Sequence, residues 1–442
     1  MGCENGSSDS STSNISTPSS YTITFDANGG SGTMKEITAR NSETLPSSEF
    51  TPPTGKVFGG WNTKANGRGT QYDAGETVYI YSDTTLYAQW VDPVATVKVA
   101  ETTTEYGTVM DAVKAANEAN GSTITLKRNS ATSALTIGGN NITLDLNGCT
   151  LETNSTDSAY SFTSLLTVSS SASLTIKDSG TNGGIYYKIK QGSSYTTSQT
   201  ICNYGSLTVE GGTIKNTGGT SSSYAIATPS SSSSDAKLTI SGGTISSDSS
   251  YAIYDGSSYG STITISGGTI TSKAKDAVSL SKGSITVTQG TISSTDGSAI
   301  KGGTSNISGG SISSDNTYAI ANSNITLSGN PQITGKNADI QLTFPSTYND
   351  ANHKIAKDLT MSTALKITDG QSSTSRFFDE KTIFSSDNNY TIKQGDVDKL
   401  KLVDSKGNDY KYETSYSSYT TYTYTFQLDS SKNAVTLKET TS

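Results

Sequence analysis

Several residue types are scarce in this 442-residue chain, which has one histidine, three cysteines, two tryptophans and a hydrophobic content of 31%. It contains no uninterrupted apolar run of about 18 residues, the length that a membrane-spanning helix needs. Three cysteines cannot build the disulfide framework of a small secreted domain. With a net charge of −8, the chain also lacks the basic character that favours binding to nucleic acid or an anionic membrane. We therefore expect neither a transmembrane segment nor a nucleic-acid partner.

Groups with catalytic or metal-binding chemistry are scarce as well. The nucleophile-elbow, P-loop and zinc-spaced motifs are missing, and no arginine occurs between Arg128 and Arg376. The single histidine, His353, has no serine or cysteine nucleophile motif near it. Cys149 and Cys202 fall at different positions of the repeat described below, so we expect free thiols rather than a disulfide or a metal pair. The sequence thus predicts no catalytic residue, no metal site and no cofactor.

What the chain does contain is a repeated pattern over residues 209–327, in which Thr-Ile or Thr-Val, a glycine-rich pair and Thr-Ile or Ser-Ile recur. Each copy has two apolar residues five positions apart, and in the last four copies an alanine follows seven positions later. The apolar pairs are Val209 and Ile214, Ile240 and Ile245, Ile265 and Ile270, Val287 and Ile292, and Ile307 and Ile312; the alanines are Ala252, Ala277, Ala299 and Ala319. A period of roughly 20 to 50 residues is typical of a solenoid.

Within one repeat, short apolar segments separated by Gly- and Ser-rich corners leave no room for a helix. We therefore predict an all-β fold, a right-handed parallel β-helix with three strands in each coil. Coils of this kind stack about 4.8 Å apart, so equivalent β-branched residues form ladders that face inward. Much Ser and Thr is also typical of disordered chains, but disordered chains do not keep a fixed spacing between isoleucines.

The corners of the coils do not collect acidic residues. Lyases and hydrolases of the β-helix type need acids grouped on neighbouring coils, for calcium or for acid and base roles. Two aligned corner rows read Asp248, Lys273, Thr295, Asp315 and Tyr251, Asp276, Ser298, Tyr318, with no two acids in succession. Asp145 lies in a strand of the first coils, where we expect a local structural acid. The sequence therefore disfavours an enzyme.

One corner varies in length from coil to coil. Between the last inward residue of a coil and the first of the next, the chain spends 14, 12, 9 and 7 residues in succession from Ile226 to Ile307. Insertions on one face of a solenoid often mark the binding face. The long corners contain Tyr254, Asp255 and Tyr259, an aromatic pair beside an acid, which suits the apolar face and the hydroxyls of a sugar. We take these three as candidate ligand-binding residues; the alternative is that the loops are solvated and bind nothing.

Residues 21–91 have a pattern of their own. Phe-Asp-x-Asn-Gly-Gly begins at Phe25, Gly-Trp ends at Trp61, and Leu-Tyr-Ala-x-Trp ends at Trp90. In this order the motifs closely resemble the Listeria–Bacteroides repeat, a small β-grasp-like module of internalin-type surface proteins. The resemblance implies a bacterial, secreted, cell-surface protein and does not imply catalysis. We expect the core of this module to contain Phe25, Phe58, Trp61, Tyr87 and Trp90.

The first residues form a segment rich in serine and threonine. Ten of the seventeen positions in residues 4–20 are Ser or Thr, a composition typical of a flexible tether. Together with Cys3, this segment resembles the mature start of a bacterial lipoprotein, in which a lipidated cysteine precedes a polar spacer. The resemblance implies that Cys3 is a lipidation site and that the protein is held at the cell surface or outer membrane. The alternative is a chance cysteine in a disordered tail.

The remaining segments complete the division of the chain. Residues 1–20 are the tether, and residues 92–108 are predicted to link the N-terminal module to the coils. Thr108, with Asp111 three positions on, predicts the start of a capping helix. Residues 109–344 then resemble pectate-lyase-like β-helix proteins, including many adhesin-like surface proteins. Residues 345–442 lose the repeat and are predicted to form a β-rich C-terminal cap or small domain.

Three functions remain open on these grounds. The sequence favours an adhesin-like, lipid-anchored surface protein that binds an extracellular glycan or a host or matrix protein through its β-helix. The first alternative is a polysaccharide lyase or glycoside hydrolase of the β-helix type, and the second is a passive surface stalk. Binding is favoured over a stalk because the chain has 24 tyrosines, and exposed aromatic faces suit sugars.

Overall fold

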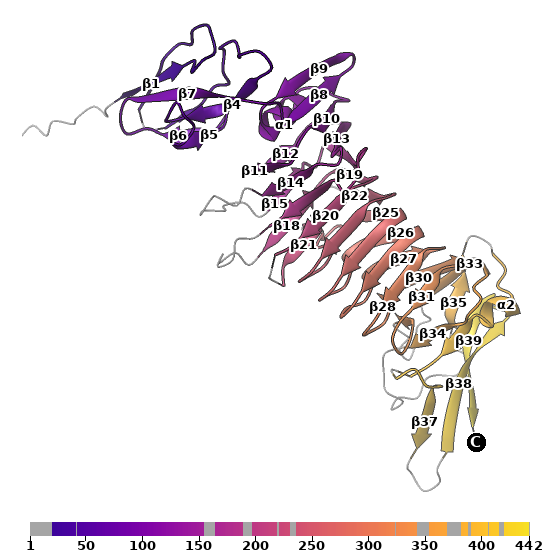
Figure 1. Cartoon of the computed structure of the whole chain (residues 1–442). Coiled ribbons are helices and arrows are strands. Elements are labelled where there is room, and N and C mark those ends of the chain that lie inside the picture. Colours follow the sequence, from indigo (N-terminus) through magenta and orange to yellow (C-terminus); the bar gives the residue numbers. More distant parts are fainter. Residues whose placement is uncertain are drawn as a thin grey trace, which may run out of the picture. The chain divides into compact units, whose positions relative to one another are not determined.

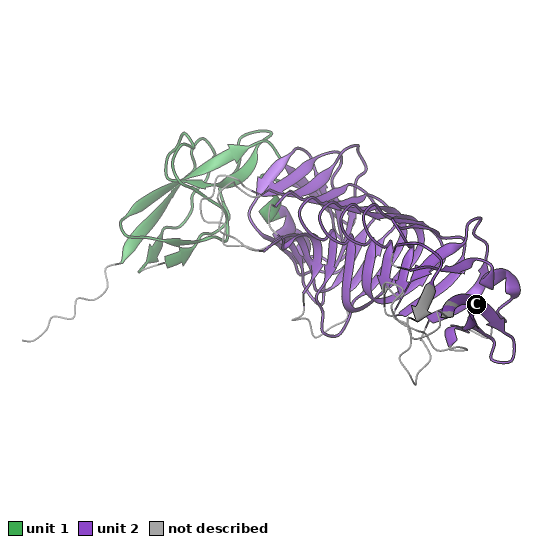
Figure 2. Ribbon diagram, turned by 90° about the horizontal axis from the view of Figure 1, so that it is seen from below, with its two compact units in different colours: residues 1–93, 106–111 green, residues 94–105, 112–442 purple. Residues whose placement is uncertain are grey.

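The computed structural model describes residues 20–40, 42–153, 164–188, 197–218, 221–229, 236–322, 324–342, 353–368, 382–387, 390–404, 406–414 and 420–441. Cys3 and the tether lie outside these residues. The chain divides into two compact units, one of residues 1–93 and 106–111 and the other of residues 94–105 and 112–442 (Figure 2). In the described part of the chain, no helix has the length and hydropathy needed to cross a bilayer.

The first unit contains a mixed five-stranded sheet in the order β2-β1-β7-β4-β5, with β1 and β7 parallel, and a second, two-stranded sheet of β3 and β6. Its strands are β1 (Tyr21–Asp26), β2 (Ile37–Ala39), β3 (Ser42–Thr44), β4 (Val57–Asn62), β5 (Gln71–Tyr72), β6 (Thr77–Tyr79) and β7 (Thr84–Val91). Alternation along β1 buries Ile23 and Phe25. The turn that follows β1 uses Asn28 and Gly29, both with positive φ, as an Asn-Gly turn requires.

Trp61 is at the centre of the core of this unit. Its side chain is fully buried, its ring centroid is 4.7 Å from that of Phe25, and its indole N–H donates to the Pro46 carbonyl at 2.8 Å. Trp90 and Phe58 are half-buried against the same cluster. The prediction for Tyr87 was wrong, because the alternation along β7 buries Leu86 and Ala88 and turns Tyr87 to the other face.

The second unit is dominated by parallel strands that stack as a solenoid-like series of coils, which we call the coil stack (Figure 1). Each strand pairs in parallel with the strand one coil later, which is usually the third strand further along the chain. These pairings form three separate rows. The first row is β10 (Thr123–Leu126), β13 (Ile142–Asp145), β16 (Ser173–Lys177), β19 (Ser206–Val209), β22 (Lys237–Ile240), β25 (Thr262–Ser272), β26 (Val278–Ser294), β27 (Ile300–Ile307) and β30 (Asn324–Gly329).

The long strands β25, β26 and β27 run through corners of the coil, so each of them belongs to more than one row. The second row is β11 (Ser130–Thr132), β14 (Thr150–Thr153), β17 (Gly184–Tyr187), β20 (Thr213–Asn216), β23 (Thr244–Ser247), β25, β26, β28 (Ser311–Ser314) and β31 (Gln332–Thr334). The third is β12 (Leu135–Ile137), β15 (Ser164–Val168), β18 (Ser198–Asn203), β21 (Ser223–Thr228), β24 (Ile253–Asp255), β26, β27, β29 (Ile320–Asn322) and β32 (Ile340–Leu342).

The registers confirm the inward ladders predicted from the spacing of the isoleucines. Ile240, Ile265, Val287 and Ile307 are partners in successive coils, and so are Ile245, Ile270, Ile292 and Ile312. A third ladder contains Ile253, Val278, Ile300 and Ile320. Every one of these side chains is at most 1% exposed. Each coil therefore buries its apolar residues against its neighbours, and the core remains thin.

A glycine ladder forms one corner of the coil stack. Gly212, Gly243, Gly268, Gly290 and Gly310 all have positive φ, between 76° and 93°. Space is short there as well, because a Cβ atom on Gly268 would lie 2.7 Å from the carbonyl oxygen of Gly242 in the preceding coil. The repeated glycine is thus required both by the backbone conformation and by the close approach of two coils.

Helix α1 (Val109–Asn117) begins where the capping motif predicts. The Thr108 hydroxyl donates to the Asp111 carboxylate at 2.8 Å and accepts from the Asp111 backbone N–H at 3.0 Å. The segment predicted as a linker, residues 92–108, contains β8 (Ala95–Val99) and β9 (Thr102–Tyr106), and β8 pairs antiparallel with β10. The first row of the coil stack is therefore extended by β8, a short strand whose sequence has no repeat signature.

Parallel pairing also continues beyond residue 344, where the sequence pattern ends. β33 (His353–Leu359) pairs with β30 and with β35 (Thr382–Ser386), and β34 (Leu365–Thr368) pairs with β32 and with β36 (Leu400–Leu402). Apolar residues still alternate there, but the Gly-Gly corner is gone, so the period is invisible in the sequence. The short helix α2 (Gln394–Val397) lies between β35 and β36 in the chain, and β36 is followed by the antiparallel strands β37 (Lys411–Thr414), β38 (Thr420–Asp429) and β39 (Ala434–Thr441).

Candidate ligand-binding surface

Three tyrosine rings lie together on the outside of two neighbouring coils. Tyr224 is on β21, and Tyr251 and Tyr254 come from the next coil, just before and on β24. The ring centroids of Tyr224 and Tyr254 are 4.7 Å apart with an interplanar angle of 21°, and those of Tyr251 and Tyr254 are 5.4 Å apart at 22°. We call these three residues the tyrosine cluster. All three side chains are half-buried, so part of the stacked surface is open to solvent.

Local sequence explains why the rings point outward. In β24, Ile253 and Asp255 are buried and Tyr254 between them is not, as strand alternation requires. Gly256 follows, and a Cβ atom at that position would lie 2.9 Å from a ring carbon of Tyr254. The ring therefore extends over the backbone of Gly256, where any larger residue would displace it.

The structure separates the three candidate residues predicted from the sequence. Tyr254 belongs to the tyrosine cluster, but the side chain of Asp255 is fully buried and does not reach the surface. Its Oδ1 accepts from the Thr228 hydroxyl at 2.8 Å and from the Ser257 backbone N–H at 3.1 Å, and its Oδ2 accepts from the Gly283 backbone N–H at 3.1 Å. Asp255 therefore organises the corner from inside, and its carboxylate is not placed to contact a sugar hydroxyl.

Tyr259, the third candidate, is 73% exposed. The loop that carries it is held by Ser257, whose hydroxyl oxygen accepts hydrogen bonds from the backbone N–H groups of Tyr259 and Gly260 at 3.2 and 3.1 Å. Since Ser257 is itself bonded to Asp255, the buried acid helps to position the exposed tyrosine. The corner predicted from the sequence thus presents Tyr254 and Tyr259 on the outside, whereas its acid, Asp255, lies inside.

Tyr224 and Tyr251 were missed as site residues, although a signal for both existed. Each lies two positions before an inward isoleucine, Ile226 or Ile253, and these two isoleucines are partners in the parallel register. Aligning the coils on that pair would have placed both tyrosines at the same corner position.

The acids of this region are engaged in ion pairs and backbone contacts. Asp248 lies 2.8 Å from both Lys215 and Lys273, and hydrogen bonds from these lysines outweigh partial burial and hold the pKa of Asp248 below its ordinary value of 3.8. Burial raises the pKa of Asp276, whose Oδ1 accepts from the Ser298 backbone N–H at 2.8 Å. Burial, together with the Asp276 carboxylate, also raises the pKa of Tyr251 above its ordinary value of 10.0. The ring of Tyr251 is thus a neutral phenol at physiological pH.

The other residues considered for chemistry have structural contacts. Asp145 accepts from the backbone N–H groups of Asn147 and Ser179, each at 3.0 Å, which agrees with its expected structural role. Cys149 and Cys202 are both free thiols, and burial raises the pKa of Cys202 to about 11. Within the described ranges, no group of three His, Cys, Asp or Glu residues is close enough to hold a metal ion.

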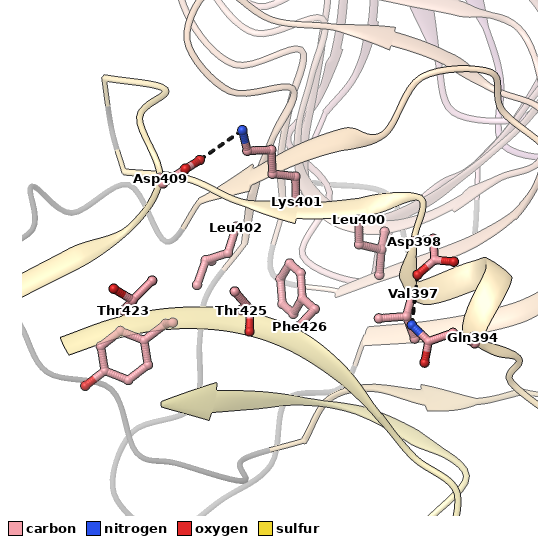
Figure 3. Close-up of a pocket in the computed structure, with 11 residues that line it drawn as sticks. Gln394, Val397, Asp398, Leu400, Lys401, Leu402, Asp409, Thr423, Thr425 and Phe426 are labelled. Atoms are coloured by element: carbon pink, nitrogen blue, oxygen red, sulfur yellow. Dashed lines mark hydrogen bonds and ion pairs between the residues drawn. The ribbon is translucent and has the colours of Figure 1, made fainter. Parts of the chain in front are cut away.

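A cavity of about 320 Å³ lies in the C-terminal part of the second unit, between α2, β36 and β38 (Figure 3). Leu400, Leu402 and Phe426 supply its apolar lining. Its polar groups are already joined to one another, since Lys401 pairs with Asp409 at 2.9 Å and the Gln394 amide donates to Asp398 at 2.8 Å (Figure 3). No side chain of this cavity therefore indicates a particular class of ligand.

The N-terminal sheet, with its buried Trp61 and with Trp90 bonded through its indole N–H to the Ala27 carbonyl at 2.9 Å, gives structural form to the motifs of residues 21–91. Residues 21–89 match the Listeria-Bacteroides repeat domain. Such domains occur in surface proteins, so the match suggests a bacterial surface protein and is consistent with an extracellular location. No curated protein and no solved structure matches the chain.

Proposed function

We propose that this protein is an adhesin-like, lipid-anchored protein of the bacterial cell surface that binds an extracellular glycan through the coil stack. The observation that carries this proposal is the tyrosine cluster, a stacked aromatic surface built by two coils and left half-open to solvent. Apolar ring faces of this kind pack against the C–H faces of sugars, while phenol hydroxyls remain free for hydrogen bonds. The Listeria-Bacteroides match supports the surface location.

Binding is tested with the full chain on an array of host and bacterial glycans and matrix proteins. Replacing Tyr224, Tyr251 and Tyr254 together by Ala is expected to weaken binding of the best glycan roughly tenfold or more, because each aromatic contact contributes about 0.5–1.5 kcal/mol. The matched control is Tyr79→Ala with Tyr81→Ala, which removes two exposed tyrosines of the N-terminal module.

Each other result of that screen points to one of the alternatives. An affinity for the glycan that stays within twofold of the parent chain moves the site away from the tyrosine cluster. A matrix protein as the main ligand favours protein recognition, and no ligand at all favours a passive stalk. Cleavage of a bound glycan, seen as new reducing or unsaturated ends, favours a polysaccharide lyase or hydrolase and overturns the assignment of binding without catalysis.

The lipid anchor rests on Cys3 and the Ser/Thr-rich tether. Stable anchoring needs more than one acyl chain, since a single chain binds membranes only weakly. The full-length protein, expressed in a bacterial host, is expected in the membrane fraction, and Cys3→Ala is expected to release it. An unchanged membrane fraction for Cys3→Ala would refute the anchor.

We also infer that the coil stack is a right-handed parallel β-helix, capped by α1 and by the antiparallel strands β37, β38 and β39. The hand is supported by the general rule that parallel crossover connections are right-handed, and the caps by the need of every solenoid to cover its terminal coils. We propose residues 21–91 as the N-terminal module, a β-grasp-like one. A crystal structure of the full chain tests the hand and the caps.

A further inference from the structure

One lysine, Lys275, stands next to the rings of the tyrosine cluster. Lys275 places its ammonium nitrogen 5.3 Å from the ring centroid of Tyr251, a cation–π distance. Its side chain is half-exposed. In the described part of the chain, no carboxylate oxygen lies within 4.0 Å of this nitrogen. Lys275 therefore stands beside the aromatic surface without a carboxylate at ion-pair distance, and its charge acts on Asp276 from further away.

The neighbouring lysines differ from Lys275 because each has a carboxylate. Lys215 and Lys273 share Asp248 at 2.8 Å, and Lys301 is 3.9 Å from Asp276. Asp276 is only 7% exposed and Asp255 is fully buried, so neither carboxylate is available at the surface. Asp296, an exposed acid, lies in the following coil, where its backbone N–H donates to the Lys273 carbonyl. Lys275 is thus the cation that stands at the rings, although the whole chain has a net charge of −8.

The chemistry of the lysine ammonium indicates which class of anionic group a ligand would place there. Arginine, whose planar guanidinium binds carboxylates and phosphates in a bidentate way, does not occur between Arg128 and Arg376. A lysine ammonium acts as a point charge with three rotatable donors, and this suits a tetrahedral anion whose charge is spread over several oxygens. A sulfate ester on a sugar is such an anion.

We propose that the tyrosine cluster binds a sulfated glycan, with a sugar ring against the stacked tyrosines and a sulfate ester on Lys275. This inference rests on the proposed glycan-binding function and adds the class of sugar to it. Lys275 is the residue that determines the preference for sulfate, and the tyrosines provide the contact that is common to all glycans. Binding of the sulfated ligand weakens with ionic strength, since an exposed ion pair is screened by salt.

The test measures binding of the full chain to chondroitin sulfate, to desulfated chondroitin, which keeps its carboxylates, and to neutral dextran. Chondroitin sulfate is expected to bind roughly three- to tenfold more tightly than desulfated chondroitin, as one charge-assisted contact allows. Lys275→Gln is expected to remove this difference and its salt dependence, and Lys275→Arg to retain most of both. Lys237→Gln, at an exposed lysine of strand β22, is the matched control and should change nothing.

The outcomes separate this inference from the proposed function. If Lys275→Gln weakens both chondroitins equally, the recognised group is the carboxylate and the sulfate assignment is wrong. If all glycans bind and Lys275→Gln has no effect, the inference fails while glycan binding stands. If no glycan binds the parent chain in this set or on the array, the proposed function itself fails. Near-UV circular dichroism of Lys275→Gln checks that the tyrosine cluster is intact.

Discussion

Asp255 Oδ2 accepts a hydrogen bond from the backbone N–H of Gly283, 3.1 Å away in the following coil. The other oxygen of the same carboxylate accepts from Thr228 in the preceding coil and from Ser257 in its own loop. Gly283 allows this approach because a Cβ atom there would lie 2.6 Å from the carboxylate oxygen. One buried acid thus joins three successive coils at the corner that presents Tyr254 and Tyr259.

Asp255→Asn is expected to destabilise the coil stack. An amide group can accept at one end only, so the backbone N–H of either Gly283 or Ser257 would lose its acceptor inside the protein, at a cost of about 1–3 kcal/mol. The measurement is the urea midpoint of unfolding. Asp315→Asn, at an exposed corner position, serves as the control and should leave the midpoint unchanged. Equal midpoints for Asp255→Asn and the parent chain would show that this carboxylate does not hold the corner.

Ile270→Asp tests the inward register. Ile270 is fully buried between Ile245 and Ile292, and an unpaired carboxylate at that position loses its hydration at a cost of several kcal/mol. Thr271→Asp, one position on and half-exposed, is expected to change the free energy of unfolding by less than about 0.5 kcal/mol. Thermal unfolding compares the two variants, and similar midpoints for both would contradict the register.

Gly268→Ala is expected to cost more than Gly121→Ala. Both glycines have positive φ, 76° and 75°, a conformation that costs an alanine roughly 1–2 kcal/mol. A Cβ atom at Gly268 additionally meets the Gly242 carbonyl oxygen at 2.7 Å, whereas nothing lies within 4 Å of one at Gly121. The difference between the unfolding midpoints of the two variants therefore measures the clash between coils separately from backbone strain. Equal midpoints would mean that the coils move apart freely.

Asp248→Asn is expected to lower stability at neutral pH but not in strong acid. The pKa of Asp248 in the folded protein is held below its ordinary value of 3.8 by Lys215 and Lys273, against the effect of burial. A depressed folded pKa gives stability that is fully present above the unfolded pKa and is lost as the pH falls through the folded pKa. The difference in free energy of unfolding between the parent chain and Asp248→Asn should therefore shrink below about pH 3.8.

Asp276→Asn provides a control of opposite sign. Burial raises the pKa of Asp276 above 3.8 in the folded protein, so ionisation at neutral pH destabilises the parent chain at this site. Relative to the parent, Asp276→Asn should gain stability as the pH rises from below 3.8 through the folded pKa. If the stabilities of the Asp248 and Asp276 variants relative to the parent chain changed in the same direction with pH, at least one of the two assignments would be wrong.

Much of the fold follows from local rules that are visible in the sequence. The spacing between Ile265 and Ile270 recurs coil after coil, and since β-branched residues stack in parallel ladders, that spacing alone predicts the registers that the structure contains. The motifs around Trp61 and Trp90 likewise indicate the N-terminal module, because its small core needs large aromatic groups at set positions. The continuation of pairing to Leu402 was not visible, since it depends on alternation without the glycine corner.

The sequence by itself determined the period of the coils, the inward residues and the corner with variable length. Only the tertiary structure decided what that corner presents. Whether Asp255 faces the core or the solvent depends on strand alternation within β24, and whether Tyr224 meets Tyr254 depends on how two coils lie on each other. The physical reason is that ladders are defined by repeated local spacing, whereas a surface is made by residues about 30 positions apart that only stacking brings together.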